Sequence, residues 1–119
     1  MSTPTVFHYP NCSTCRKARK WLEAQGVEHE LVDIVESPPS AKVLKSALAA
    51  SGLPVKRFFN TSGQSYRNGG FKETLPGMSD AEAIAALAAD GKLIKRPLVI
   101  AGDTVLVGFR EPEWAEVFG

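Results

Sequence analysis

This sequence of 119 residues has few cysteines, no long hydrophobic run and almost no excess of either charge. No apolar run approaches the roughly 20 residues that a membrane-spanning helix needs, so we expect no contact with a membrane. The formal net charge of +1 does not favour direct binding to nucleic acid. The N-terminus lacks the charged and apolar regions of a signal peptide. These absences predict a cytoplasmic protein, and the length predicts a single domain over residues 1–119.

The two cysteines, Cys12 and Cys15, are only two residues apart. In a reducing compartment such a pair is more often catalytic or metal-binding than structural. An apolar stretch precedes the pair and a helical pattern follows it, which predicts a junction between a strand and a helix. There the first sulfur faces unpaired amide N–H groups and the positive end of the helix dipole, which stabilise a thiolate. We therefore expect Cys12 to be the nucleophile and Cys15, one turn further in, to resolve its adduct through a disulfide.

Two other interpretations of this pair stay open. Tetrahedral zinc needs four ligands, and His8 and His29 are the only other soft candidates in the sequence. The cysteines could also be inert, buried side chains. The position between strand and helix favours a redox site, with no bound metal or cofactor.

Hydrophobic periodicity and the Pro and Gly breakers predict an α/β fold. We expect strands at residues 5–9, 28–34, 98–101 and 105–108, and helices at 12–25, 40–51, from 54, 79–90 and from 112. The helix between the first two strands makes them a parallel, right-handed βαβ unit, and the last two strands form a hairpin. Residues 60–70 are polar and glycine-rich, which predicts a loop or a mobile lid. The expected buried positions of the first two helices are Cys15, Ala18, Trp21, Leu22, Val43, Leu44, Ala47 and Leu48.

Four segments carry recognisable motifs, and together they extend over nearly the whole chain. They are residues 7–18 with Trp21-Leu22, residues 58–63 with Tyr66-Arg67, residues 93–97, and residues 105–109. Their order and spacing resemble the arsenate reductase (ArsC)/Spx-like family of the thioredoxin superfamily. The resemblance implies a thioredoxin-like fold with helices inserted between the βαβ unit and the hairpin. A proline before the third strand of such a fold commonly packs beside the cysteine pair, and we expect a cis bond at Arg96-Pro97.

The same resemblance implies roles for individual residues. Cys12 matches the nucleophile that attacks arsenic in the arsenate reductases, and His8 matches a histidine associated with it. Arg96 matches one arginine that holds the oxyanion, and Arg110 matches a second. Asn60 stands near the position of a third. The Cys-x-x-Cys arrangement itself is that of the Spx-type regulators, in which it forms a regulatory disulfide.

Several neighbours are expected to act on the Cys12 sulfur. Arg96, a protonated His8, and Arg16 if it folds back over the first turn, would each lower the pKa of this thiol. The hydroxyls of Ser13 and Thr14 are candidates to bind an anionic oxygen. The alternatives are a hydrogen-bonded histidine at a sheet edge for His8, and ordinary surface positions for the arginines, Arg110 included.

These residues lead to three hypotheses about function. The first is a thiol-dependent reductase acting on a small oxyanion, arsenate by family resemblance, with electrons from glutathione, glutaredoxin or thioredoxin. The second is an Spx-type regulator that binds RNA polymerase and uses the Cys12–Cys15 disulfide as its switch. The third is a relative that shares the fold and the redox pair but acts on a different thiol substrate.

Overall fold

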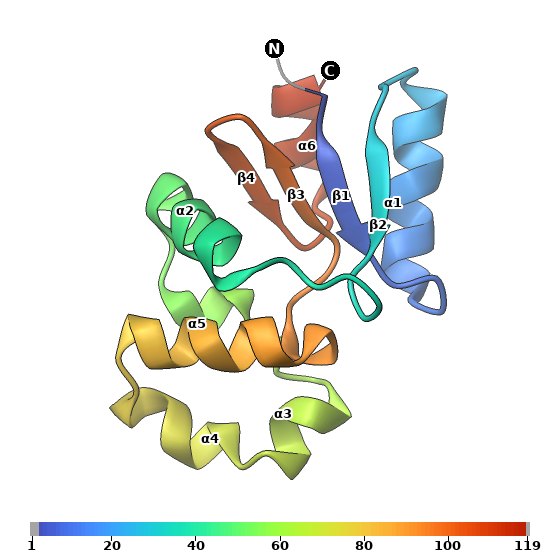
Figure 1. Ribbon diagram of the computed structural model, residues 1–119. Coiled ribbons are helices and arrows are strands. Elements are labelled where there is room, and N and C mark those ends of the chain that lie inside the picture. The colour runs from blue at the N-terminus through green and yellow to red at the C-terminus, as the bar shows by residue number, and fades with distance from the viewer. Residues whose placement is uncertain (1–2, 119) are drawn as a thin grey trace.

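A mixed, four-stranded sheet forms the centre of the computed structural model, which describes residues 3–118 (Figure 1). Its strands are β1 (Thr5–His8), β2 (Glu30–Asp33), β3 (Leu98–Ala101) and β4 (Thr104–Val107), in the order β2-β1-β3-β4. β1 and β2 are parallel, whereas β3 is antiparallel to both β1 and β4. The predicted βαβ unit and hairpin are thus confirmed, and they meet where β1 pairs with β3. The result is the expected thioredoxin-like fold.

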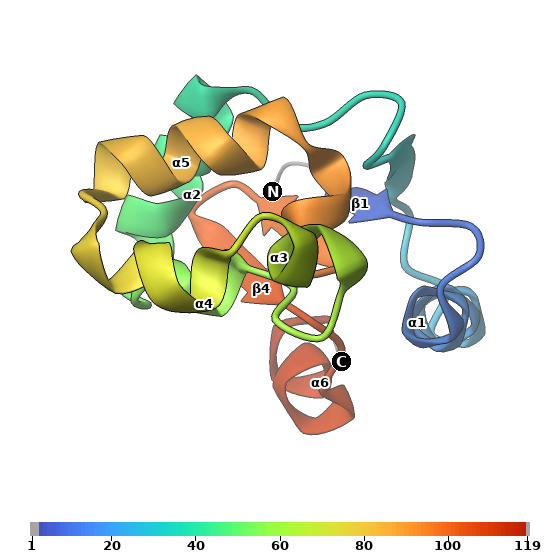
Figure 2. The same cartoon turned by 90° about the horizontal axis from the view of Figure 1, so that it is seen from below.

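The helices cover both faces of this sheet. They are α1 (Ser13–Ala24), α2 (Ala41–Ser51), α3 (Gln64–Asn68), α4 (Phe71–Thr74), α5 (Asp80–Ala89) and α6 (Glu111–Phe118), with short 3-10 turns η1 (Val55–Phe58), η2 (Leu75–Gly77) and η3 (Gly91–Leu93). Figure 2 shows α1 and α6 separated from the group formed by α2, α3, α4 and α5. Within residues 3–118, every helix is too short or too polar to span a bilayer.

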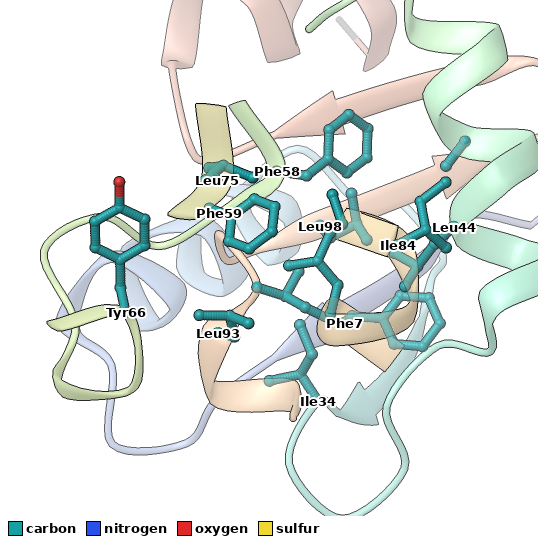
Figure 3. Packing of buried hydrophobic residues seen from close by; sticks show 14 residues of the cluster. Phe7, Ile34, Leu44, Phe58, Phe59, Tyr66, Leu75, Ile84, Leu93 and Leu98 are labelled. Carbon is teal, nitrogen blue, oxygen red and sulfur yellow. The ribbon is translucent and has the colours of Figure 1, made fainter. Parts of the chain in front are cut away.

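Side-chain alternation along the strands assigns each residue to one face of the sheet. Val6, Val99 and Leu106 are register partners and pack with Leu22 of α1 and Trp114 of α6. The next position on β1 points the other way. There Phe7 and its partner Leu98 enter the larger core beneath α2 and α5, which also contains Phe58, Phe59 and Ile84 (Figure 3).

Helix capping agrees with the expectations from local sequence. The Ser79 hydroxyl oxygen accepts a hydrogen bond from the Glu82 amide, and the Ser79 amide donates one to Glu82 Oε1, which completes the predicted capping box of α5. Ser40 caps α2 in the expected way. Gly91 follows α5 and is fully packed, because a Cβ at this position would collide with the Ile34 carbonyl oxygen. This close approach joins the end of α5 to the end of β2.

The prediction of a loop or mobile lid at residues 60–70 was wrong. The segment contains α3, and Tyr66 in its middle is buried. The Tyr66 ring lies 6.4 Å from that of Phe59 and 6.2 Å from that of Phe71, centroid to centroid. Aromatic packing therefore orders a stretch whose composition alone indicates a loop.

One predicted core position of α2 was also wrong. Val43 is 37% exposed, while Leu44 and Ala47 are buried. The α2 residues that pack into the larger core are Leu44, Ala47 and, in part, Leu48. The buried stripe of this helix is therefore narrower than its apolar composition suggests.

Candidate active site at the start of the first helix

Cys12 lies at the turn that joins β1 to α1, at the lower end of the sheet in Figure 1. Its amide donates to the Tyr9 carbonyl at 3.0 Å, and its own carbonyl accepts the first helical bond, from the Arg16 amide at 3.1 Å. Its backbone is extended (φ −94°, ψ 120°), so Cys12 occupies the N-cap position of α1. The side chain is partly exposed. The sulfur thus stands where the predicted strand-to-helix junction places it.

The environment of Cys12 favours its thiolate. Burial acts to raise its pKa, but hydrogen bonds from the Cys15 amide, the Cys15 thiol and Arg96 outweigh that effect, and the positive charge of Arg96 adds to them. The pKa of Cys12 therefore lies below its ordinary value of 9.0. His8 and Arg16, two other expected sources, are not among the causes of this shift.

Cys15 has the opposite character. It is fully buried, and burial is the main reason why its pKa is raised to about 12. The hydrogen bond to Cys12 and the negative charge on that neighbour raise it further. Both cysteines are free thiols in the structure. Cys12 is therefore the more acidic of the two thiols, while Cys15 stays protonated at neutral pH.

Arg96 is the cation that hydrogen-bonds to Cys12. Its guanidinium carbon stands 4.8 Å from the centre of the Tyr9 ring, and its Nη1 donates to the Lys92 carbonyl at 3.3 Å. Its Nε is buried without a hydrogen-bond partner among the described residues. The peptide bond between Arg96 and Pro97 is cis, as expected. The side chain is thus held beside Cys12 with donor capacity to spare.

Two polar clefts meet at Arg96. The first has a volume of about 280 Å³, and Thr14, Arg96 and Arg110 are part of its wall. The second has about 320 Å³ and is lined by Tyr9, Asn60 and Arg96 among others. The structure therefore brings three of the predicted anion-binding residues to one cleft and Asn60 to its neighbour.

Two other predicted residues, Ser13 and Arg16, line neither cleft. Ser13 is exposed at the first position of α1. Arg16 does fold back over the first turn, but its Nε donates to the Pro10 carbonyl at 3.1 Å. Arg110, in the wall of the first cleft, is exposed and forms an ion pair with Glu113 at 3.5 Å, so its role in binding an anion stays a prediction.

His8 belongs to a different environment from the one expected. It is buried, and burial is the main cause that lowers its pKa from 6.5, followed by the charge of Arg19, while Asp33 opposes the shift. This lowered pKa disfavours the protonated state that the expected effect on the Cys12 sulfur requires. Its Nδ1 has no partner among the described residues. Its register partner is Asp33 of β2.

No zinc site accompanies the cysteines in the part of the chain that the structure describes. Within residues 3–118, no three His, Cys, Asp or Glu side chains gather closely enough to hold a metal ion. The other candidate ligand, His29, has its Nδ1 2.8 Å from the Val27 carbonyl oxygen. The pair is better described as a dithiol than as half of a metal centre.

Sequence analysis did not predict three residues that lie at or near the site. Arg57 and Lys95 line the first cleft, and Arg19 acts on His8. Lys95 directly precedes Arg96, so the basic pair before Pro97 was a usable signal for it. Arg57 comes from a segment far away in the sequence, and nothing local indicates that it reaches the same cleft.

Comparison with known proteins agrees with this geometry. The protein YusI of Bacillus subtilis (strain 168), itself uncharacterized, is 51% identical over 112 residues, which cover 94% of this chain and 95% of that relative. An arsenate reductase of Rhizobium meliloti (strain 1021) is 32% identical over 99 residues, covering 83% and 69% of the two chains. The global transcriptional regulator Spx of Streptococcus pyogenes serotype M1 is 28% identical over 109 residues, covering 92% and 80%.

The solved structures lead to the same family. An ArsC-family-related protein from Bacteroides fragilis superimposes with a TM-score of 0.94 at 46% identity, covering 97% of each chain. The family model described as "ArsC family" matches residues 7–117. That span includes both cysteines, Arg96 and Arg110. The chain therefore belongs to the ArsC family.

Proposed function

We propose that the protein is a thiol-dependent reductase in which Cys12 attacks the substrate and Cys15 resolves the adduct. The contrast in acidity between two adjacent thiols is the observation that supports this assignment. Cys12 has a lowered pKa and partial exposure, while Cys15 is buried with a pKa of about 12. A nucleophile must be ionised and accessible, and a resolving thiol must stay inactive until the adduct exists. The cytoplasm, whose reducing conditions keep both thiols free, is the compartment in which we expect this chemistry.

Arsenate is the oxyanion substrate that the family suggests. In the first step the Cys12 thiolate attacks arsenic(V), an S–As bond forms, and one oxygen leaves as water after protonation. Arg96 and Arg110 would hold the remaining oxygens. In the second step Cys15 loses its proton and attacks the Cys12 sulfur. The S–As bond breaks, its electron pair stays on arsenic as arsenite, and the protein dithiol becomes a disulfide.

The coupling between the thiols gives these steps their order. The charge and hydrogen bonding of Cys12 raise the pKa of Cys15. Once the Cys12 sulfur is in a covalent adduct it no longer carries that charge, so the pKa of Cys15 falls. Adduct formation thus makes Cys15 easier to ionise, while burial, the main cause of its raised pKa, still acts on it. Glutathione, glutaredoxin or thioredoxin would supply the two electrons that restore the dithiol.

An assay with purified protein tests the proposal. Arsenate is offered with glutathione and glutaredoxin in one series and with thioredoxin and its reductase in another, and NADPH oxidation is followed. Activity should vanish in Cys12→Ser. The matched variant Cys15→Ser should accumulate a mixed disulfide on Cys12 that intact-mass measurement detects. Adducts confined to Cys15 in the wild-type protein would reverse the assignment of roles.

A regulator is the second candidate function. The similarity to the global transcriptional regulator Spx over most of the chain favours it. In that case the same disulfide would change a surface that binds RNA polymerase, with no substrate turned over. Capture of polymerase subunits that depends on the oxidation state, and that Cys15→Ser makes insensitive to oxidant, would support the regulator. Turnover with either donor system, without such capture, would support the enzyme.

A further inference from the structure

The first cleft, whose wall includes the Arg96 side chain that bonds to Cys12, carries more positive charge than one oxyanion requires. Four cations line it: Arg57, Lys95, Arg96 and Arg110. Among residues 3–118, no aspartate or glutamate is part of its wall. Its volume of about 280 Å³ lies near the lower end of the range for small-molecule sites, about 300–1,000 Å³. The space and the charge therefore fit an anionic molecule larger than a single oxyanion.

The four cations differ in the contacts that their side chains already make. Arg96 contacts the Cys12 sulfur, the Tyr9 ring and the Lys92 carbonyl. Arg110 pairs with an acidic neighbour one turn away. Arg57 and Lys95 form no ion pair and no side-chain hydrogen bond within the described part of the chain. Unpaired surface cations are common, so the lack of partners does not by itself indicate a ligand site.

The backbone holds Arg57 and Lys95 next to each other. The Lys95 amide donates to the carbonyl of Phe58, the residue after Arg57, at 2.8 Å. The neighbouring amide of Asn60 donates to the Leu93 carbonyl at 2.7 Å, so two bonds flank an antiparallel bridge between residues 59 and 94. Phe58 itself is anchored in the core. This bridge joins η1 to the segment before β3 and places the two cations in one wall.

The Lys95 side chain also lies along the cleft. Its Cε would stand 3.3 Å from a Cβ built at Gly108, a residue of the same wall. Gly108 has φ 75°, a conformation that favours glycine, and its missing side chain leaves the space that Lys95 crosses. Val107 and Phe109 on either side add apolar surface. Lys95 is therefore held against the cleft with its ammonium group free for a ligand.

We propose that Arg57 and Lys95 form a second anion subsite, which selects small disulfides that carry a carboxylate. The inference rests on the thiol chemistry proposed above. The Cys12 thiolate attacks one sulfur of R–S–S–R, the S–S bond breaks, and R–S⁻ leaves. The retained R group is then disulfide-bonded to Cys12, with its carboxylate at Arg57 and Lys95. Cys15 loses a proton to solvent and attacks the Cys12 sulfur, expelling the second R–S⁻. Two electrons pass from the protein dithiol to the disulfide.

Two chromogenic disulfides test this subsite. 5,5′-Dithiobis(2-nitrobenzoate) carries one carboxylate on each half, whereas 4,4′-dithiodipyridine is neutral at pH 7. Stopped-flow absorbance gives the second-order rate of each with the reduced protein. The test variant is Arg57→Gln/Lys95→Gln. The matched control is Lys42→Gln/Lys45→Gln on α2, which removes the same charge from exposed positions in a different groove.

We expect the test variant to lose about tenfold in rate with the carboxylated disulfide, since charge-assisted hydrogen bonds to the carboxylate are lost. Its rate with the neutral disulfide should stay within about twofold, and the control should change neither rate selectively. Equal losses with both disulfides, or no loss, would overturn the subsite. Arsenate that slows modification of Cys12 in the wild-type protein but not in the test variant would assign Arg57 and Lys95 to an oxyanion. That result would overturn the carboxylate assignment. If the wild-type protein reacts with both disulfides no faster than free cysteine, the proposed function itself fails.

Discussion

Limited alkylation of the native protein should modify Cys12 and spare Cys15. The two thiols are neighbours in sequence, so their difference comes from their surroundings in the fold. The pKa of Cys15 is about 12, against an ordinary value of 9.0. This three-unit rise reduces its thiolate fraction at pH 7 about 1,000-fold relative to an unperturbed thiol. The pKa of Cys12 lies below 9.0, which widens the difference.

Intrinsic nucleophilicity acts against this preference, but it is the smaller effect. A more basic thiolate reacts faster, with a Brønsted coefficient of about 0.4–0.5 for exchange reactions. Over three pKa units that advantage is about 16-fold to 32-fold for Cys15. Thiolate fraction therefore still favours Cys12 by at least about 30-fold before steric access is counted. Burial of Cys15 adds to this margin.

Iodoacetamide at pH 7, quenched at short times and followed by a second label after denaturation, measures the two rates. No lysine or arginine precedes Arg16 in the sequence, so trypsin leaves both cysteines in one peptide and fragment ions must assign the label. Cys12→Ser is the control, because burial, the main cause of the raised pKa of Cys15, remains in that variant. Similar labelling of the two native thiols, or faster labelling of Cys15, would refute the reasoning.

Three further changes test the structure around the site. Arg96→Ala should raise the pKa of Cys12, so that its alkylation rate rises only at higher pH. The control Arg16→Ala should leave this pH profile unchanged, because Arg16 bonds to the Pro10 carbonyl. Equal profiles for the wild-type protein and both variants would remove Arg96 from the site. Ser79→Ala should lower the free energy of unfolding in urea by about 1 kcal/mol. The capping box lowers the pKa of Glu82 below 4.5. The stabilising contribution of this carboxylate is therefore present above pH 4.5 and lost as the pH falls through the lowered pKa. The difference in free energy of unfolding between the wild-type protein and the variant should narrow at that low pH. Trp114→Ala should lower the free energy of unfolding by about 3–5 kcal/mol, because this side chain is fully buried and its Nε1 donates to the Gly108 carbonyl at 3.2 Å. A loss below about 1 kcal/mol would show that neighbouring side chains fill the cavity left by the tryptophan.

The elements that sequence analysis predicted correctly are those stabilised by neighbours in the chain. The capping box of α5 uses residues three positions apart, and the N-cap position of Cys12 depends on the strand and helix on either side of it. Such short-range relations appear directly in the order of residues. The helix α3 was missed because Tyr66 is ordered by Phe59 and Phe71, which a reading of local composition does not include.

The residue sequence alone therefore determined the dithiol, its junction between strand and helix, and the α/β character of the fold. Only the tertiary structure decided which distant side chains meet there. Pairing of β1 with β3 brings Arg96 to Cys12, and the bridge between residues 59 and 94 adds Arg57 to the same cleft. It also decided that burial and the charge of Arg19 lower the pKa of His8, against the effect of Asp33. Hydrogen bonding between strands acts across any distance in sequence, and burial depends on every element that covers a residue, so neither can be derived from local order.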